Sequence, residues 1–175
     1  FSFMLARFPF KGSGILIGLF FAGMMIPVHC TLIPLYNMMN MAGLIDHLWA
    51  LLFPYVASSL PIAVFLTYGH YQQLPKELEE AARIDGCSVT GMFFRVFLPL
   101  SKPVISTISI LTALSAWNEF MFANVFLSDP NQKTLPIGLL ALKGTYSTDY
   151  AALCAALTMS AVPIILVYVL MSNKI

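Results

Sequence analysis

Four long apolar stretches alternate with short polar segments along this chain. The charge-free stretches are Gly12–Ile45, His47–Pro75, Pro103–Asn118 and Tyr150–Asn173. A helix needs about 20 predominantly apolar residues to cross the hydrocarbon core of a bilayer, so the pattern predicts four membrane-spanning helices. Their predicted bounds are 14–35, 49–71, 104–126 and 150–172. The pattern therefore indicates an all-α, polytopic transmembrane helix bundle.

The composition excludes an ordinary soluble domain. Of the 175 residues, 59% are hydrophobic and 10% are charged, and the mean hydropathy is +0.83, whereas a soluble domain has about 25% charged residues. We expect the lipid bilayer to be a partner, and a net charge of +1 gives no sign of nucleic-acid binding. The three cysteines have no CxxC spacing and the histidines no metal-like spacing, so we predict no disulfide framework, no metal site and no cofactor.

The distribution of basic residues predicts the orientation in the membrane. If successive loops alternate between sides, two basic residues before the first span, four between the second and third spans (Lys76, Arg83, Arg95 and Lys102) and one after the last span share a face. That is seven of the nine Lys and Arg residues, and the richer side is cytoplasmic by the positive-inside rule. The loop at 75–99 is therefore predicted to be cytoplasmic, and the segment at 127–149 to face outward.

The two ends of the chain have the pattern expected of a fragment of a longer protein. The segment Phe1–Phe8 is mostly apolar and is followed by Pro9 and Lys11, like the last turns of an earlier span. We therefore expect residues 1–175 to be a single transmembrane domain in fragment form. The alternative is a complete protein with a short N-terminus.

The main cluster of charge lies in the loop at 75–99, whose first part has the signals of a short helix. Proline suits the first helical position, acidic residues in the first turns complement the helix dipole, and Gly86 is a typical C-terminal stop. These signals predict a helix over Pro75–Asp85. Glu79 and Arg83 are four residues apart and correctly ordered for an ion pair.

A second short helix is predicted after Gly86. Ser88 can cap its N-terminus, and apolar residues recur at helical spacing: Val89, Met92, Phe93, Val96 and Phe97. Two short helices joined at a glycine would form a rigid knob on which a soluble cytoplasmic protein could dock. An amphipathic connector that rests on the lipid surface explains the same residues, and their chemistry alone leaves both open.

The loop resembles the EAA loop of ATP-binding-cassette (ABC) importer permeases. The matching positions are Glu80-Ala81-Ala82, Gly86, Val96 and Leu98-Pro99, with valine in place of the commoner isoleucine at Val96. The surrounding Ile84-Asp85-Gly86 and the later Trp117-Asn118-Glu119-Phe120 resemble the carbohydrate-uptake branch, the maltose-type and glycerol-phosphate-type permeases. The resemblance covers nearly the whole chain.

This resemblance implies the type I ABC importer fold, of which the chain would be part of a roughly six-span subunit. It implies a permease subunit that forms the pathway for a sugar or related solute, in a bacterial or archaeal cytoplasmic membrane. The implied partners are a cytoplasmic ABC ATPase dimer, a second and different permease subunit, and an extracytoplasmic solute-binding protein. The subunit itself would not be an enzyme, and the sequence contains no GxxxxGK[ST] phosphate-binding loop.

The resemblance also assigns roles within the loop. Its first helix would sit in a groove of the ATPase, with Glu80 as a charge contact and the two alanines permitting close approach. Gly86 would make the turn, and the Val96, Leu98 and Pro99 positions would fix the knob to the membrane domain. The predicted coupling residues are Glu79, Glu80, Ala81, Ala82, Asp85, Gly86, Val96, Leu98 and Pro99.

Three residues are candidates for the substrate pathway. Glu119 is the one carboxylate within a predicted span, and an intramembrane ionisable group is a functional candidate by default. Trp117 could stack on a sugar and Asn118 could form hydrogen bonds with it. The structural alternatives are an interfacial anchor for the tryptophan and an interfacial position for the carboxylate.

Two other classes of function compete with an importer. A gradient-driven secondary transporter or channel would be expected to carry charge near mid-bilayer, where only Glu119 comes close, and would leave the loop unexplained. A membrane-embedded enzyme would need a convergent cluster of His, Asp or Cys residues, and the sequence shows no such cluster.

Overall fold

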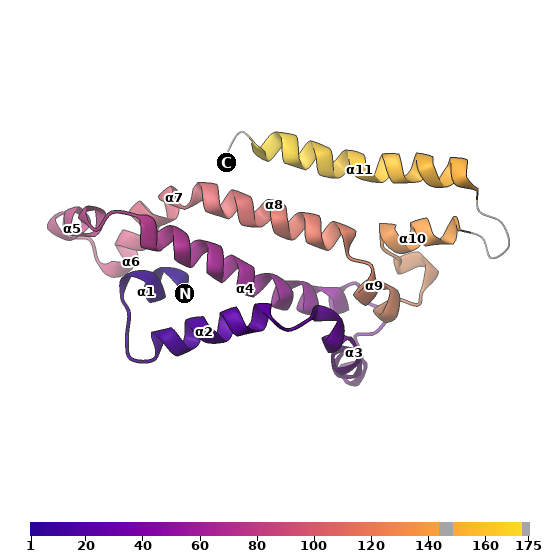
Figure 1. The fold of residues 1–175 in the computed structure, drawn as a ribbon, viewed down its shortest axis with the longest axis horizontal. Helices are drawn as coiled ribbons and strands as arrows, with labels where there is room; N and C mark the ends of the chain where they lie inside the picture. Colours follow the sequence, from indigo (N-terminus) through magenta and orange to yellow (C-terminus); the bar gives the residue numbers. More distant parts are fainter. Residues whose placement is uncertain (144–148, 173–175) are drawn as a thin grey trace. The chain divides into compact units, whose positions relative to one another are not determined.

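The computed structural model describes residues 1–143 and 149–172. Within these residues, the regular secondary-structure elements are all helices (Figure 1). Residues 144–148 of the predicted outer segment, and Lys174, lie outside the described residues. The α-helices are α1 Ser2–Arg7, α2 Ser13–Met24, α3 Leu32–Met41, α4 Trp49–Gln73, α5 Glu77–Ile84, α6 Val89–Met92, α7 Leu98–Leu100, α8 Lys102–Asn118, α9 Met121–Phe126, α10 Leu135–Ala141 and α11 Tyr150–Ser172. Shorter 3-10 or π-helical elements are η1 Val28–Thr31, η2 Phe93–Phe97 and η3 Pro130–Gln132.

The chain divides into two compact units. The first unit consists of Phe1–Met25 and Ser59–Ser109, and the second of Ile26–Ser58 and residues 110–172. The helices α4 and α8 each contribute residues to both units. The loop at 75–99 lies in the first unit, and the predicted substrate residues lie in the second.

An aromatic cluster forms the core of the first unit. Phe3, Tyr71, Met92 and Phe97 are all buried, and the Phe3 ring centroid lies 4.8 Å from that of Phe97 and 5.6 Å from that of Tyr71. The buried Ser101 hydroxyl bonds to the Phe97 carbonyl at 2.6 Å and to the Tyr71 hydroxyl at 3.0 Å. Its polar atom is therefore satisfied, as burial requires, and the start of α8 is tied to the end of α4.

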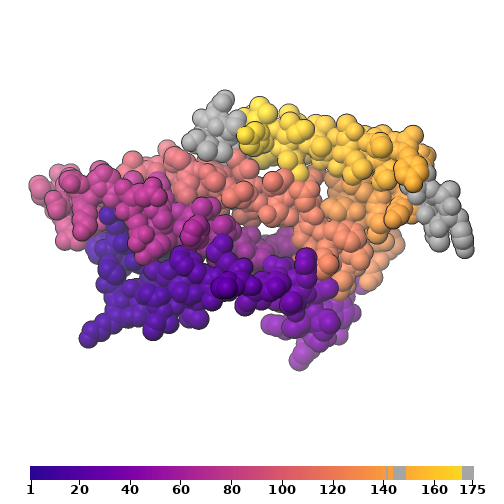
Figure 2. Space-filling view, viewed as in Figure 1, coloured from indigo at the N-terminus to yellow at the C-terminus, as the bar shows by residue number. Residues whose placement is uncertain are grey.

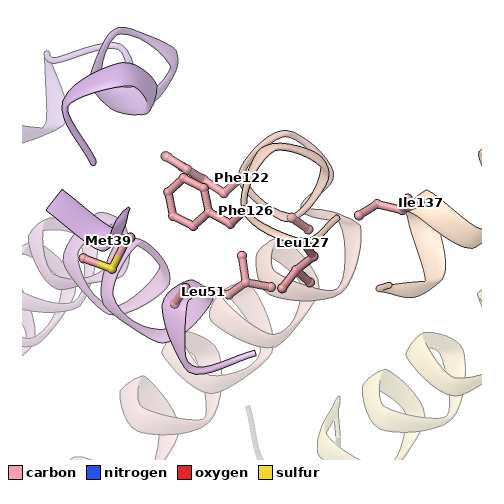
Figure 3. Close-up of a cluster of buried hydrophobic side chains, with 8 residues drawn as sticks. Met39, Leu51, Phe122, Phe126, Leu127 and Ile137 are labelled. Atoms are coloured by element: carbon pink, nitrogen blue, oxygen red, sulfur yellow. The ribbon is translucent and has the colours of Figure 1, made fainter. Parts of the chain in front are cut away.

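The core of the second unit is a separate apolar cluster, shown in Figure 3. Side chains from α3, α4, α9 and α10 converge there, including Met39, Leu51, Phe122, Phe126 and Ile137. Beside it, the Asp46 carboxylate accepts hydrogen bonds from the Ser128 and Asp129 backbone N–H groups. This links the connection after α3 to the connection after α9.

Two helices are long and apolar enough to cross a membrane, α4 and the stretch Tyr150–Leu170 of α11. Two bent helix pairs also pass the same test of length and composition when each pair is counted together, which gives up to four spans. The predicted span at 14–35 falls on α2, η1 and the start of α3, and the one at 104–126 falls on α8 and α9. Neither is one continuous helix, and the four spans remain predictions.

Candidate functional site

The first helix of the loop ends as its sequence predicts. Helix α5 begins two residues later than predicted, at Glu77, and has acidic residues in its first turn. At its end the Gly86 N–H donates to the Arg83 carbonyl at 3.0 Å and the Cys87 N–H to the Ala82 carbonyl at 2.9 Å, while Gly86 has φ +73°. This pair of bonds with a left-handed residue is a Schellman motif, which confirms the predicted stop.

The second part of the loop is more irregular than predicted. The Ser88 hydroxyl accepts a hydrogen bond from the Gly91 N–H at 3.2 Å, which confirms the predicted cap of α6. After one α-helical turn the backbone becomes π-helical over Phe93–Phe97. Such π segments are rare in proteins, and those that occur often lie at functional sites. Here the segment leads directly into Leu98 and Pro99.

The two long faces of α5 have different surroundings. Glu80, Ala81, Ile84 and Asp85 are exposed, and Ile84 has 86% of its surface accessible although it is apolar. Ala82, in contrast, is buried in the aromatic cluster of the first unit. The helix lies at one end of that unit, and its atoms are visible at the left edge of Figure 2. Within the described residues, the outer face of α5 is therefore exposed.

The carboxylate of Glu79 faces inward. Its Oε1 lies 3.1 Å from Nε of Arg7, the last residue of α1, and both side chains are largely buried. The predicted ion pair between Glu79 and Arg83 is wrong, since the Arg83 guanidinium instead lies over the Phe8 ring, 5.8 Å from its centroid. An exposed ion pair at this spacing contributes only about 0.2–0.5 kcal/mol. Glu79 therefore pairs with the buried Arg7 in preference to the exposed Arg83.

The residues at the end of the loop are placed by their neighbours. Val96 and Leu98 are half-buried and Pro99 is exposed, whereas Phe97 between them is fully buried with Met92. The helical spacing of the apolar residues had marked Phe97 and Met92 as part of one face. The predicted coupling residues, from Glu79 to Pro99, all lie in the first unit.

Glu119 has its carboxylate occupied by the protein itself. Its oxygens accept hydrogen bonds from the Phe122 N–H at 2.7 Å, the Ala123 N–H at 3.1 Å and the Tyr55 hydroxyl at 2.8 Å. The first N–H groups of a helix have no partner within it, so this carboxylate caps α9 and breaks the predicted continuous helix. Sequence reasoning missed Tyr55, because no local pattern connects it to a residue 64 positions away.

Trp117 and Asn118 lie together at the end of α8, beside a cavity of about 310 Å³. The Trp117 indole N–H donates to the Ser160 carbonyl at 3.2 Å, and the Asn118 amide donates to the Leu114 carbonyl at 2.9 Å. Apolar residues of α10 and α11 complete the lining, among them Leu139 and Leu157. The cavity is therefore lined by an aromatic ring, an asparagine residue and apolar walls.

Metal-ligating side chains are scattered in the described residues. Over 1–143 and 149–172 there is no group of three or more His, Cys, Asp or Glu side chains that could hold a metal ion.

The sequence matches the model of a known family over residues 1–173, the binding-protein-dependent transport system inner membrane component. The chain belongs to this family. The predicted membership of the ABC importer permeases is thereby confirmed, and the coupling role of the loop stays a prediction.

Individual relatives agree with this assignment. The chain is 44% identical over 169 residues to the protein named "probable ABC transporter permease protein YurM" of Bacillus subtilis, covering 97% of this chain and 56% of the relative. It is 32% identical over 174 residues to the sulfoquinovosyl glycerol transport system permease protein SmoH of Agrobacterium fabrum, covering 99% and 61%. The chain thus spans less than two thirds of the length of these relatives.

A solved structure shows the same fold. It is the crystal structure of a bacterial ABC transporter involved in the import of the acidic polysaccharide alginate, with a TM-score of 0.81 and 22% identity. The match covers 98% of this chain and 65% of that chain. The predicted all-α fold of an ABC importer permease is confirmed.

Proposed function

We propose that this chain is the pore-forming part of a permease subunit in an ATP-driven importer, and that α5 is its coupling helix. The observation that carries the proposal is the outer face of α5, where acidic Glu80 and Asp85 flank a small residue and a fully projecting Ile84. Burying an isoleucine side chain contributes about 1.5–3 kcal/mol. A face of this kind suits a groove with an apolar floor and a basic rim.

The proposed partner at this face is a cytoplasmic ABC ATPase dimer. The bonds that close α5 at Gly86 and the aromatic cluster beneath Ala82 hold the helix as a rigid projection. Closure of the ATPase dimer on ATP would move α5 as a body. The movement would pass to the ends of α4 and α8, which are joined at Tyr71 and Ser101.

The proposed cargo is a sugar or a related solute. Support comes from relatives whose names state such cargo, including a trehalose/maltose permease of Thermococcus litoralis that is 32% identical over 176 residues. In this chain the cavity is lined by Trp117 and Asn118, and a sugar ring can stack on an indole while its hydroxyls bond to a carboxamide. We propose that these two residues contact the solute in the substrate pathway, and that Glu119 supports them by holding the start of α9 without touching the solute.

The remaining partners follow from the same proposal. A second permease subunit, different from this one, would complete the pore, and an extracytoplasmic solute-binding protein would deliver the solute. Helix α11 is apolar along its length, and its most apolar 18-residue stretch is 0% buried. Lipid and the second permease would cover it, in a multi-pass subunit of a bacterial or archaeal cytoplasmic membrane.

A gradient-driven carrier is the alternative function. Its strongest candidate residue is Glu119, the carboxylate expected within a span. Because three donors from Tyr55 and the start of α9 already occupy that carboxylate, a role in binding a transported proton or cation is disfavoured.

The proposal is tested with the full-length subunit, co-expressed with its candidate partner permease and ATPase. ATPase co-purification is compared for wild type, Glu80→Ala and Gly86→Asp, after membrane insertion of each variant has been checked. Lys133→Ala is the control, because it removes an exposed charge from the predicted outer segment.

We expect Glu80→Ala and Gly86→Asp to insert but to lose the ATPase, while Lys133→Ala retains it. If the ATPase binds equally to all four proteins, or never binds, the coupling assignment is refuted. Uptake that continues without ATP hydrolysis would favour the gradient-driven carrier instead.

A further inference from the structure

We infer that Arg7 is a positioning residue for the coupling helix and that Glu79 serves as its anchor rather than as a contact with the ATPase. The inference rests on the proposed function of α5. It concerns a residue that lies outside the loop and more than 60 positions earlier in the chain.

Arg7 joins three segments of the first unit. One guanidinium nitrogen donates to the backbone carbonyls of Leu74 and Pro75, between α4 and α5. Its Nε lies 3.1 Å from Glu79 Oε1 on α5, and its Cζ lies 5.3 Å from the centroid of the Phe97 ring in η2. A single side chain thus touches the beginning of the loop, its first helix and its π-helical segment.

Burial makes Arg7 and Glu79 depend on each other as charge partners. The exposed fraction of the side chain is 5% for Arg7 and 14% for Glu79. A charge enclosed to this degree needs its partner, because removal of one member leaves the other desolvated and uncompensated. Arginine is suited to the position, since its planar guanidinium presents several donors in a fixed fork and stacks on aromatic rings.

The residues around Arg7 support the same connection. Phe3, one turn earlier in α1, packs in the aromatic cluster with Phe97 and Phe93. Phe8, directly after Arg7, lies beneath the Arg83 guanidinium of α5. Helix α1 and the loop therefore pack as one body, and Arg7 fixes the rotation and height of α5 within it.

This arrangement divides the acidic residues of α5 between two tasks. Glu79 is turned toward Arg7, while Glu80 is exposed on the outer face. Loss of the Arg7–Glu79 pair would leave the outer face chemically intact. It would loosen the connection through which a movement of α5 reaches the membrane-embedded helices.

The test uses the assembled full-length importer in proteoliposomes. Four variants are compared with wild type: Arg7→Met, Arg7→Lys, Glu79→Gln and the double variant Arg7→Met/Glu79→Gln. Arg95→Met is the matched control, because Arg95 lies in the same loop but is exposed. The measured quantities are ATPase co-purification, solute taken up per ATP hydrolysed, and amide hydrogen exchange over residues 77–84.

We expect Arg7→Met to retain the ATPase, to import several-fold less solute per ATP, and to raise amide exchange in α5 about tenfold, as for the loss of one charge-assisted hydrogen bond. Arg7→Lys should recover part of the loss, because it restores the charge opposite Glu79. The double variant should be no worse than the poorer single variant, since the two residues act as a pair.

Three results would overturn the inference: uptake per ATP that is unchanged in Arg7→Met, an equal effect of Arg95→Met, or single effects that multiply in the double variant. If wild type shows no ATP-dependent uptake, the proposed function fails first. In that case amide exchange in α5 decides the positioning role by itself, and unchanged exchange in both Arg7 variants refutes it.

Discussion

Replacement of Gly86 separates the effect of backbone conformation from the effect of the proposed contact with an ATPase. Gly86 adopts φ +73°, and a Cβ atom built there would meet nothing within 4 Å. A side chain at position 86 would therefore cost free energy through its backbone conformation, and it would not clash with neighbouring atoms. For most L-residues the left-handed region costs roughly 1–2 kcal/mol, whereas asparagine visits it more readily. We expect Gly86→Ala to destabilise the end of α5 by about this amount, and Gly86→Asn to stay close to wild type.

Amide hydrogen exchange of the full-length subunit measures this effect directly. The Gly86 and Cys87 N–H groups close the Schellman motif by donating to Arg83 and Ala82, so their protection reports its stability. A loss of 1–2 kcal/mol corresponds to exchange that is about 5–30 times faster. The amides in the middle of α4, within the same unit, should exchange at the wild-type rate and serve as the internal reference.

The two variants also make the reasoning refutable. If Gly86→Asn raises exchange as much as Gly86→Ala, strain at positive φ is not the reason for glycine here. If both variants keep wild-type exchange but lose the ATPase, the side chain obstructs docking, and the requirement for glycine belongs to the partner's groove.

Two further outcomes follow from hydrogen bonds in the structure. Ser88→Ala removes the hydroxyl that accepts from Gly91 and should destabilise α6 by about 1 kcal/mol, seen as faster exchange of the Gly91 amide; an unchanged rate would mean that the cap is not needed. Glu119→Ala should lower the thermal stability of the subunit more than Glu119→Gln, which keeps one acceptor for α9, without changing the apparent affinity for solute. A change of affinity at constant stability would instead make Glu119 a substrate ligand.

Much of the loop could be predicted from the sequence because its signals are local. Gly86 and Ser88 each determine a helix end through bonds to residues at most five positions away. The apolar spacing of the second helix likewise identified the buried residues Met92 and Phe97. Such features depend on backbone geometry, which neighbouring residues determine.

The features that sequence reasoning missed depend on residues far apart in the chain. Arg7 meets Glu79 only because α1 packs against α5, and Tyr55 meets Glu119 only because α4 packs against the start of α9. The apolar pattern also predicted one uninterrupted helix over 104–126, since it contains no sign that Glu119 would cap a new helix. Glu79 and Glu119 each had several possible polar partners in the sequence. Burial in the folded chain determines which partner each one meets, and the sequence alone does not show that burial.

The exposure of Ile84 has a consequence for the assembly of the proposed complex. If an ATPase covers α5 as proposed, a copy of the subunit without that partner would hold this apolar side chain in water, with 86% of its surface accessible. Each unassembled copy would then expose an apolar surface that promotes aggregation and that chaperones and proteases acting on misassembled membrane proteins could recognise. In the proposed complex, balanced production of permease and ATPase would cover this side chain, so the residue proposed to dock on the ATPase would also report whether assembly is complete.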